Sequence, residues 1–311
     1  MPHFDAYLIV DWSASAIPKK GRDSIWIGFG RRKGRGRLQM APSSNPLTRA
    51  SAVDEIQPQL EALVAEKCRV LVGFDFPYAY PSGLARALGW RPEAQVGEWR
   101  FTWDRIIGAI QDGPDNANNR FAVASALNAE MGRRSPGPFW GGPPRCETAT
   151  FKPTSPAFPY AVAGLDVPLA RHRLAEQAMR ERGQQIQETW KLLGRGSVGS
   201  QALMGIPRVA ALLAAPGLAP HSRVWPFETG FVADPEPGRR PFILHAEIWP
   251  RVAPFEDDPT KVKDQIQVEC LVRWLAQQDD AGTLGTLLAA PRLTDAQRAA
   301  CVCEEGWILG A

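Results

Sequence analysis

Four acidic residues lie inside or at the end of hydrophobic segments that have the composition of buried strands. They are Asp11 in LIVD, Asp75 in VGFDFP, Glu228 in VWPFETG and Glu247 in LHAEIWP. Ligands of open α/β sheets bind at the carboxyl ends of the strands, where a lone carboxylate is costly to desolvate. Mg²⁺ or Mn²⁺ prefers oxygen ligands and would relieve the repulsion between such carboxylates. The pattern therefore predicts a metal site built from the four acids, although each acid taken singly is also compatible with a cap on a turn or helix.

Basic and hydroxyl side chains close to the first acid indicate a phosphate-containing substrate. Ser13, Lys19 and Lys20 follow Asp11 in a turn-rich stretch. A second basic stretch, broken by two glycines, consists of Arg31, Arg32, Lys33, Arg35 and Arg37. Such a stretch is able to follow phosphates, and a solvated turn is the alternative. The net charge of +3 is too small to require a nucleic-acid partner, but it leaves one open.

Two further features suggest contacts with a ligand. Trp140 stands in a Gly/Pro-rich segment, where its ring could stack on a base or sugar, although core packing is the commoner role of tryptophan. Residues 194–199 (GRGSVG) match the GxGxxG pattern of dinucleotide-binding turns. No buried strand precedes them and no acid follows at the required distance, so that interpretation is disfavoured. An anion contact through free N–H groups at a helix start, or a plain loop, are the alternatives.

The elements that must position these residues begin as those of an α/β protein. Residues 6–12 and 24–30 predict two strands joined as a hairpin. Residues 51–66 have one apolar face and predict a helix that Ser51 caps. Residues 69–76 then predict another buried strand. Two strands, a helix and a strand, with acids at the strand ends, are typical of an open α/β sheet.

The rest of the chain is expected to complete the sheet and cover it with helices. Later strands are predicted at 224–232 and 242–249. Helical periodicity occurs at 98–111, 116–131, 169–182, 200–214, 261–278 and 294–305. Residues 135–168 are dense in proline and glycine, which excludes a long helix there. We therefore expect a single α/β domain over residues 1–311, with 82–222 as a mainly helical, Gly/Pro-rich insertion between the early and late strands.

The order of these motifs resembles the RNase H-like superfamily. More narrowly, the chain is similar to an uncharacterised bacterial family of unknown function that is predicted to have this fold. The matching segments are DWSAS (11–15), GFDFPYAYP (73–81), GSQALMGIP (199–207), VWPFETG (224–230), AEIWPR (246–251) and EEGWILG (304–310). The resemblance implies an RNase H-like mixed sheet flanked by helices.

The same resemblance implies a chemistry. In RNase H-like enzymes, acids from the first strand, the fourth strand and a late helix hold metal ions that activate water for phosphoester cleavage. Asp11 and Asp75 match the strand acids, and Glu247 matches a strand acid of the narrower family. The late acid stays open among Asp295, Glu304 and Glu305.

These inferences converge on a divalent-metal-dependent hydrolase or nuclease that acts on a phosphoester, nucleic acid included. Asp11, Asp75, Glu247 and Asp295 are its expected catalytic acids. One alternative is a nucleotide-binding phosphotransferase of the actin-like type, in which the turn after Asp11 would wrap a phosphate tail. The other is a non-catalytic RNase H-like binding protein with a vestigial acidic site.

The composition of the chain excludes several classes of protein. Of the 311 residues, 44% are hydrophobic and 22% are charged, which excludes a disordered or fibrous protein. No apolar run approaches the roughly 20 residues that span a bilayer, so no membrane partner is expected. The start of the chain lacks the pattern of a secretory signal, and the five cysteines include no CxxC pair. We expect a cytoplasmic protein, and nothing in the sequence indicates its oligomeric state.

Overall fold

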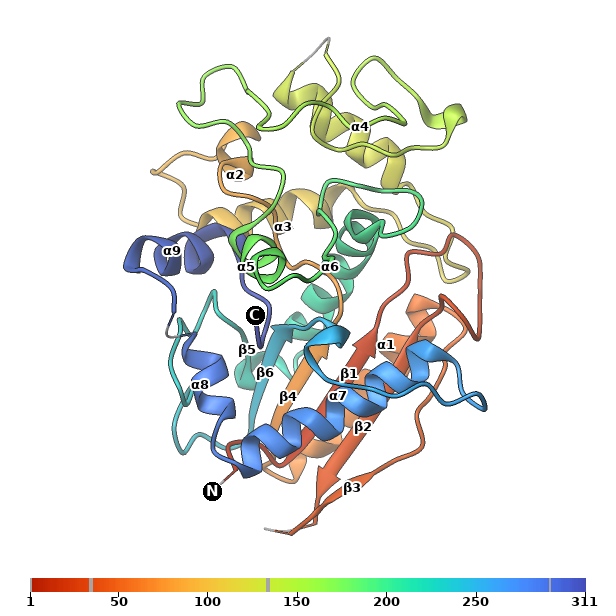
Figure 1. Ribbon diagram of the computed structural model, residues 1–311, viewed down its shortest axis with the longest axis vertical. Helices are drawn as coiled ribbons and strands as arrows, with labels where there is room; N and C mark the ends of the chain where they lie inside the picture. Colours follow the sequence, from red (N-terminus) through yellow and green to blue (C-terminus); the bar gives the residue numbers. More distant parts are fainter. Residues whose placement is uncertain (1, 34–35, 133–134, 291) are drawn as a thin grey trace.

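The computed structural model describes residues 2–33, 36–132, 135–290 and 292–311. It contains a six-stranded mixed sheet with helices on both faces (Figure 1). The strands are β1 (Ala6–Asp11), β2 (Trp26–Arg32), β3 (Leu38–Met40), β4 (Arg69–Phe74), β5 (Ser222–Val224) and β6 (Phe242–Glu247), in the order β3-β2-β1-β4-β6-β5. The first three strands form an antiparallel meander, whereas β1, β4, β6 and β5 run parallel to one another. The prediction of an α/β protein with a mixed sheet flanked by helices is confirmed.

Alternation along the strands sends side chains to two separate cores. On β1, Leu8 and Val10 belong to the cluster that includes apolar residues of α1 (Arg49–Ala65), whereas Tyr7 and Ile9 belong to the cluster on the side of α7 (Lys263–Asp280). Both faces of β1 are therefore buried, which explains why its sequence is a continuous apolar run.

Helix α7 lies unusually close to β2. A Cβ atom at Gly28 would come within 2.9 Å of the carbonyl oxygen of Val268, so only glycine permits this approach. Because α7 runs along the sheet in Figure 1, this contact fixes where its first turn lies relative to the ends of the strands.

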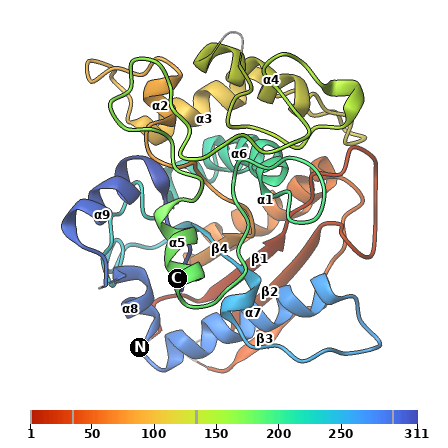
Figure 2. The ribbon, with the colours of Figure 1, turned by 45° about the horizontal axis from the view of Figure 1, so that its top comes forward.

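Between β4 and β5, the described part of residues 82–222 carries five α-helices. They are α2 (Leu84–Ala87), α3 (Glu98–Ala109), α4 (Arg120–Met131), α5 (Leu174–Glu181) and α6 (Val198–Ala214). Helices α2, α3 and α4 gather above the sheet in both views (Figures 1 and 2). Two short helices, α8 (Leu284–Ala289) and α9 (Asp295–Ala300), follow α7, and a π-helical turn at Cys301–Glu305 continues α9. Short 3₁₀ turns occupy Pro144–Cys146, Ala219–His221 and Pro250–Val252.

Most predicted elements occur at the expected positions, with shifts at their ends. The helix predicted at 51–66 begins earlier, because Thr48 accepts the N–H of Ser51 and is the cap, while Ser51 is the third residue of the capping box. The strand predicted at 224–232 was wrong beyond Val224, because the chain turns there and Glu228 accepts the N–H of Val224. The short elements β3, α2 and α8 were not predicted.

In the described structure, the Gly/Pro-rich stretch, residues 135–168, contains no long helix. Within the described part of residues 135–168, the only helical element is the three-residue turn at Pro144–Cys146, as expected. Among the described residues, no helix has both the length and the apolar character needed to cross a bilayer.

Candidate active site

Asp11 and Asp75 meet at the carboxyl ends of two neighbouring parallel strands. Asp11 is the last residue of β1, and Asp75 directly follows β4, whose register pairs Phe74 with Val10. The N–H of Asp75 donates to the carbonyl of Val10 at 3.0 Å, and the N–H of Trp12 donates to Oδ1 of Asp75 at 2.9 Å. These backbone bonds bring the two carboxyl groups into a hydrogen bond with each other. Such a bond needs one shared proton, because two carboxylates can only accept.

The surroundings of this pair favour retention of that proton. Burial, followed by the charge of Asp75, raises the pKa of Asp11 well above its ordinary value. Burial also raises the pKa of Asp75 to about 8, and the hydrogen bond from the Trp12 N–H opposes that shift. Full ionisation of the pair is therefore unfavourable near neutral pH in the absence of a cation.

A third carboxylate, Asp264, lies in the first turn of α7 and lines the same cavity. One of its oxygens, Oδ2, accepts the N–H of Asp23 at 2.7 Å, and burial raises its pKa. The sequence analysis did not select this residue, although it lies in the predicted helix 261–278. Like the acid that had been expected at Asp295, Glu304 or Glu305, it lies late in the chain, here in α7.

These acids open into a cavity of about 710 Å³. The first wall belongs to the segment that follows β1 and includes Ser13, Ser15 and Lys19. The opposite wall belongs to the segment that leads into α6 and includes residues 194–197 and Gln201. The two walls touch, because Nε2 of Gln201 donates to the carbonyl of Trp12 at 2.6 Å. Both walls are thereby fixed relative to the end of β1.

A buried arginine, Arg49, holds the segment that follows β1 in place. Nη1 of Arg49 donates to the carbonyls of Ser13 and Ser15 at 3.1 and 2.7 Å, and its other nitrogens bind the carboxylate of Asp112. Because Arg49 is fully buried in α1, the sequence DWSAS takes its shape from a helix that lies far away in the chain.

Helix α6 is positioned against the strand that carries Asp75. Its Gly205 faces Phe76, and a Cβ atom there would lie 2.3 Å from the ring. The absence of a side chain therefore lets α6 pack directly on the residue that follows Asp75, which brings the start of α6 to the cavity.

Glu247 does not line this cavity, because it is the acceptor of a buried ion pair. Both of its carboxylate oxygens bind Arg173, at 2.6 and 2.8 Å, and the N–H of Tyr78 donates to Oε2 at 3.0 Å. Arg173 is fully buried and also binds Glu176 at 2.9 Å. In this structure Glu247 therefore ties the insertion to the end of β6.

The other predicted acids are also outside the cavity. Glu228 is exposed and accepts the N–H of Val224, and Asp295 is exposed in the first turn of α9. The remaining late-acid candidates, Glu304 and Glu305, accept N–H groups of residues 82–85 and so fix the start of α2. The structure thus brings together Asp11 and Asp75 from the predicted set and adds Asp264.

The predicted phosphate contacts are divided between the two ends of the sheet. Ser13 and Lys19 line the cavity, and Lys20 is exposed beside them but outside the lining. The β1–β2 register pairs Asp11 with Trp26 and Ala6 with Arg31, so the basic stretch lies roughly 17 Å from the acids along the strand.

Two side chains of the basic stretch, those of Arg31 and Arg32, have structural partners. Arg31 pairs with Glu66, and Arg32 is buried and pairs with Asp280 at 2.8 Å. Lys33 is exposed, and Arg35 lies outside the described residues. The geometry therefore does not connect this stretch with the cavity.

Trp140 likewise has a structural environment. Its indole N–H donates to Glu188 at 3.0 Å, and its backbone binds Trp190 and Leu192 on the segment that leads to the cavity. Trp140 itself is not in the cavity lining. The Gly/Pro-rich stretch therefore supports the cavity wall from outside.

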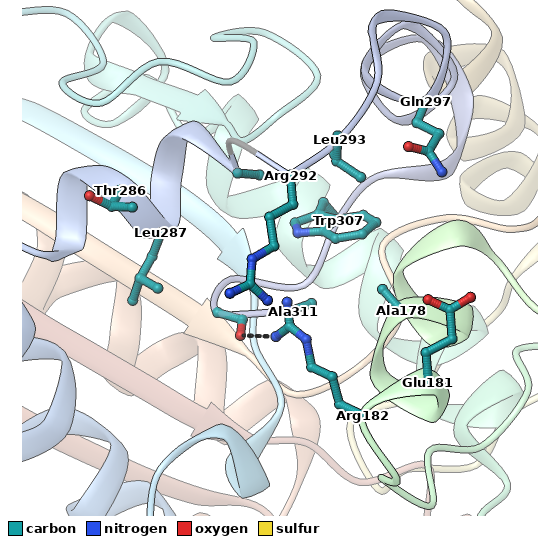
Figure 3. Close-up of a pocket in the computed structure, with 12 residues that line it drawn as sticks. Ala178, Glu181, Arg182, Thr286, Leu287, Arg292, Leu293, Gln297, Trp307 and Ala311 are labelled. Carbon is teal, nitrogen blue, oxygen red and sulfur yellow. Dashed lines mark hydrogen bonds between the residues drawn. The ribbon is translucent and has the colours of Figure 1, made fainter.

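The described residues contain no group of three or more His, Cys, Asp or Glu side chains close enough to form a ready-made metal site. A second cavity, of about 480 Å³, lies beside the C-terminal residues and is drawn in Figure 3. It is lined by Arg182, Arg292, Trp307 and one acid, Glu181, among others, and Arg182 donates to the carbonyl of Gly310 at 3.3 Å. None of the residues predicted from sequence to form the site lies in that lining.

No protein-family model, curated protein or solved structure matches this chain. The geometry of the first cavity is therefore the basis for a functional argument.

Proposed function

We propose that the chain is a divalent-metal-dependent phosphoester hydrolase with an RNase H-like fold, related to the uncharacterised bacterial family that its motifs resemble. The fold assignment is supported by the antiparallel meander β3-β2-β1 and by the parallel strand β4 next to β1. The observation that carries the function is the hydrogen-bonded pair Asp11–Asp75, which opens with Asp264 into one cavity.

The donor set of this cavity suits Mg²⁺ or Mn²⁺. Four carboxylates, those of Asp11, Asp23, Asp75 and Asp264, and no thiol or imidazole line it, and hard divalent cations prefer such oxygen ligands. The proton that Asp11 and Asp75 share takes the place that a cation would occupy between two carboxylates. When bound, the metal would polarise a phosphoryl oxygen and lower the pKa of water.

The residues of the chain would hold and orient the reactants. Asp11 and Asp75 would give up their shared proton to hold the cation, and the Trp12 N–H keeps Asp75 in place through Oδ1. Asp264 is anchored through Oδ2 to the Asp23 N–H, and its other oxygen has no protein hydrogen bond within the described ranges. That oxygen is available to accept a proton from the attacking water, and burial makes the carboxylate more basic than an exposed aspartate.

The size of the cavity favours a small phosphate compound or a nucleic-acid end over a duplex. A volume of about 710 Å³ lies within the range of roughly 300–1,000 Å³ that is usual for small-molecule sites. The basic stretch that would have followed a longer nucleic acid lies at the other end of the sheet.

The test is calorimetric titration of the metal-free protein with Mn²⁺. We expect binding by the wild type, a loss of about 100-fold or more in Asp75→Asn, and unchanged binding in Asp295→Asn, whose side chain lies outside the cavity. Metal-dependent cleavage of bis(p-nitrophenyl) phosphate or p-nitrophenyl phosphate should follow the same order. Absence of Mn²⁺ binding by the wild type, or equal binding by Asp75→Asn, would overturn the proposal.

A further inference from the structure

Arg120, the first residue of α4, is a buried cation that lines the cavity without a carboxylate partner. Only 9% of it is exposed. Its Nε donates to Oγ of Ser200 at 2.9 Å and its Nη1 donates to Oδ1 of Asn118 at 2.7 Å, both neutral acceptors. Within the described ranges it forms no ion pair, and its Nη2 has no protein hydrogen bond. Arg49 and Arg173, the two fully buried arginines, each bind carboxylates.

The electrostatic surroundings of Arg120 favour a bound anion. Burial lowers the pKa of Arg120 to about 10, and the charge of Arg49 acts in the same direction. A buried guanidinium is stabilised when a negatively charged oxygen completes its hydrogen bonds. Since the protein supplies none among the described residues, the missing partner must come from the cavity.

A row of backbone N–H groups lies on the same wall. In the described structure, the amides of residues 194–198 donate to no protein acceptor, and residues 194–197 line the cavity. Positive φ angles of 89° at Gly194 and 75° at Gly196 give the loop its shape. The left-handed φ at Gly196 favours glycine there. These amides precede the 17-residue helix α6, whose start carries a partial positive charge.

We propose that Arg120 and the amides of residues 194–198 form a seat for a phosphate group of the substrate, on the wall opposite Asp11 and Asp75. The inference deepens the proposed function and rests on it for the identity of the substrate as a phosphate compound. The acids repel a free phosphate, so we expect an anion that enters without a metal to bind at the Arg120 wall. A substrate phosphate would then lie between this seat and the cation held by the carboxylates.

The experiment is calorimetric titration with inorganic phosphate in buffer that contains a chelator and no divalent metal. We expect binding by the wild type and a weakening of about 10- to 100-fold in Arg120→Gln, as expected for the loss of charged hydrogen bonds. The matched control is Arg105→Gln, in which the lost arginine is exposed and pairs with Glu130 on the outer surface of α4. Asp75→Asn should bind phosphate about as tightly as the wild type, because the shared proton already leaves the wild-type pair with a single negative charge.

A second measurement does not depend on the folding of the Arg120 variant. Phosphate added to wild-type protein should move the amide resonances of residues 194–198. Three results would each contradict the proposed phosphate site. They are no phosphate binding by the wild type, equal binding by Arg120→Gln, and resonance changes confined to residues outside the cavity. The Mn²⁺ titration is made without phosphate, so a failure of the metal site and a failure of the seat are read separately.

Discussion

Replacement of Asp75 by asparagine should stabilise the metal-free protein although it removes an acidic residue of the candidate active site. In the wild type, Asp75 and Asp11 share a proton in a partly buried position. The amide of asparagine keeps an oxygen for the Trp12 N–H and offers a permanent donor to the Asp11 carboxylate. The variant thereby keeps a charge-assisted hydrogen bond without having to take up a proton on folding.

The size of the effect follows from the pKa of Asp75. A rise from 3.8 to about 8 would cost about 6 kcal/mol when the group is ionised, at roughly 1.4 kcal/mol for each tenfold change in proton affinity. The carboxyl groups face a cavity open to water, so we reduce this value to about 2–3 kcal/mol. For a chain of this size, that corresponds to a rise of about 3–6 °C in the melting temperature.

The sign of the pH dependence is fixed by the direction of the shift. A carboxyl whose pKa is raised on folding holds its proton longer in the folded state than in the unfolded state, so stability falls as the pH rises from about 4 to about 8. Asp75→Asn should therefore match the wild type near pH 4 and exceed it at pH 8. Melting curves by differential scanning calorimetry at both pH values, in chelator, measure the difference.

Asp295→Asn is the control, since this exposed acid in the first turn of α9 should change stability by no more than about 0.5 kcal/mol. An Asp75→Asn protein that melts below the wild type at pH 8, or a difference that does not change with pH, would refute the reasoning. Either result would mean that the carboxyl pair is stabilised by groups other than those described.

Three further outcomes follow from buried groups elsewhere. Arg173→Met should cost about 3–5 kcal/mol in chemical denaturation, because Glu247 loses its buried partner, and adding Glu247→Gln should recover part of that loss. Burial raises the pKa of Glu304 to about 7, so stability should fall between pH 4.5 and 7 by up to about 3 kcal/mol, and the melting curves of Glu304→Gln should lack that component. Gly28→Ala should cost about 1–3 kcal/mol, because the added methyl group meets the carbonyl of Val268 in α7, and a destabilisation below 0.5 kcal/mol by urea denaturation would contradict the packing argument.

The sheet was predictable because its signals are local. β1 and β4 are buried on both faces, so each reads as a short apolar run, and β2 follows β1 closely enough to form a hairpin. The errors occur where local signals are weak. The three-residue strand β3 is too short to show a period, and the segment after β5 has strand-like residues that a turn uses instead.

The active-site residues were predictable only in part, because strand-end acids look alike in a sequence. Asp75 directly follows β4, whereas Glu247 is the last residue of β6 and pairs with Phe74, one residue earlier in the register. Glu247 is neutralised by Arg173, which is 74 residues away. No local pattern reveals that pairing. Asp264 was missed for the converse reason, since it reaches the cavity only because α7 packs tightly against β2.

Buried charges that stabilise the fold are paired with each other, whereas in the described structure the carboxyl pair and Arg120 in the cavity have no ion-pair partner. Glu247 and Arg173 neutralise each other, and Arg49 neutralises Asp112. Across the cavity, by contrast, the carboxyl pair at Asp11 and the guanidinium of Arg120 each lack an ionic partner among the described residues, although they line the same space. The protein holds these opposite charges apart by fixed elements, the strand ends on one side and the start of α4 on the other. Charges held apart in this way destabilise the empty cavity, and a cation together with a phosphate would satisfy both walls at once.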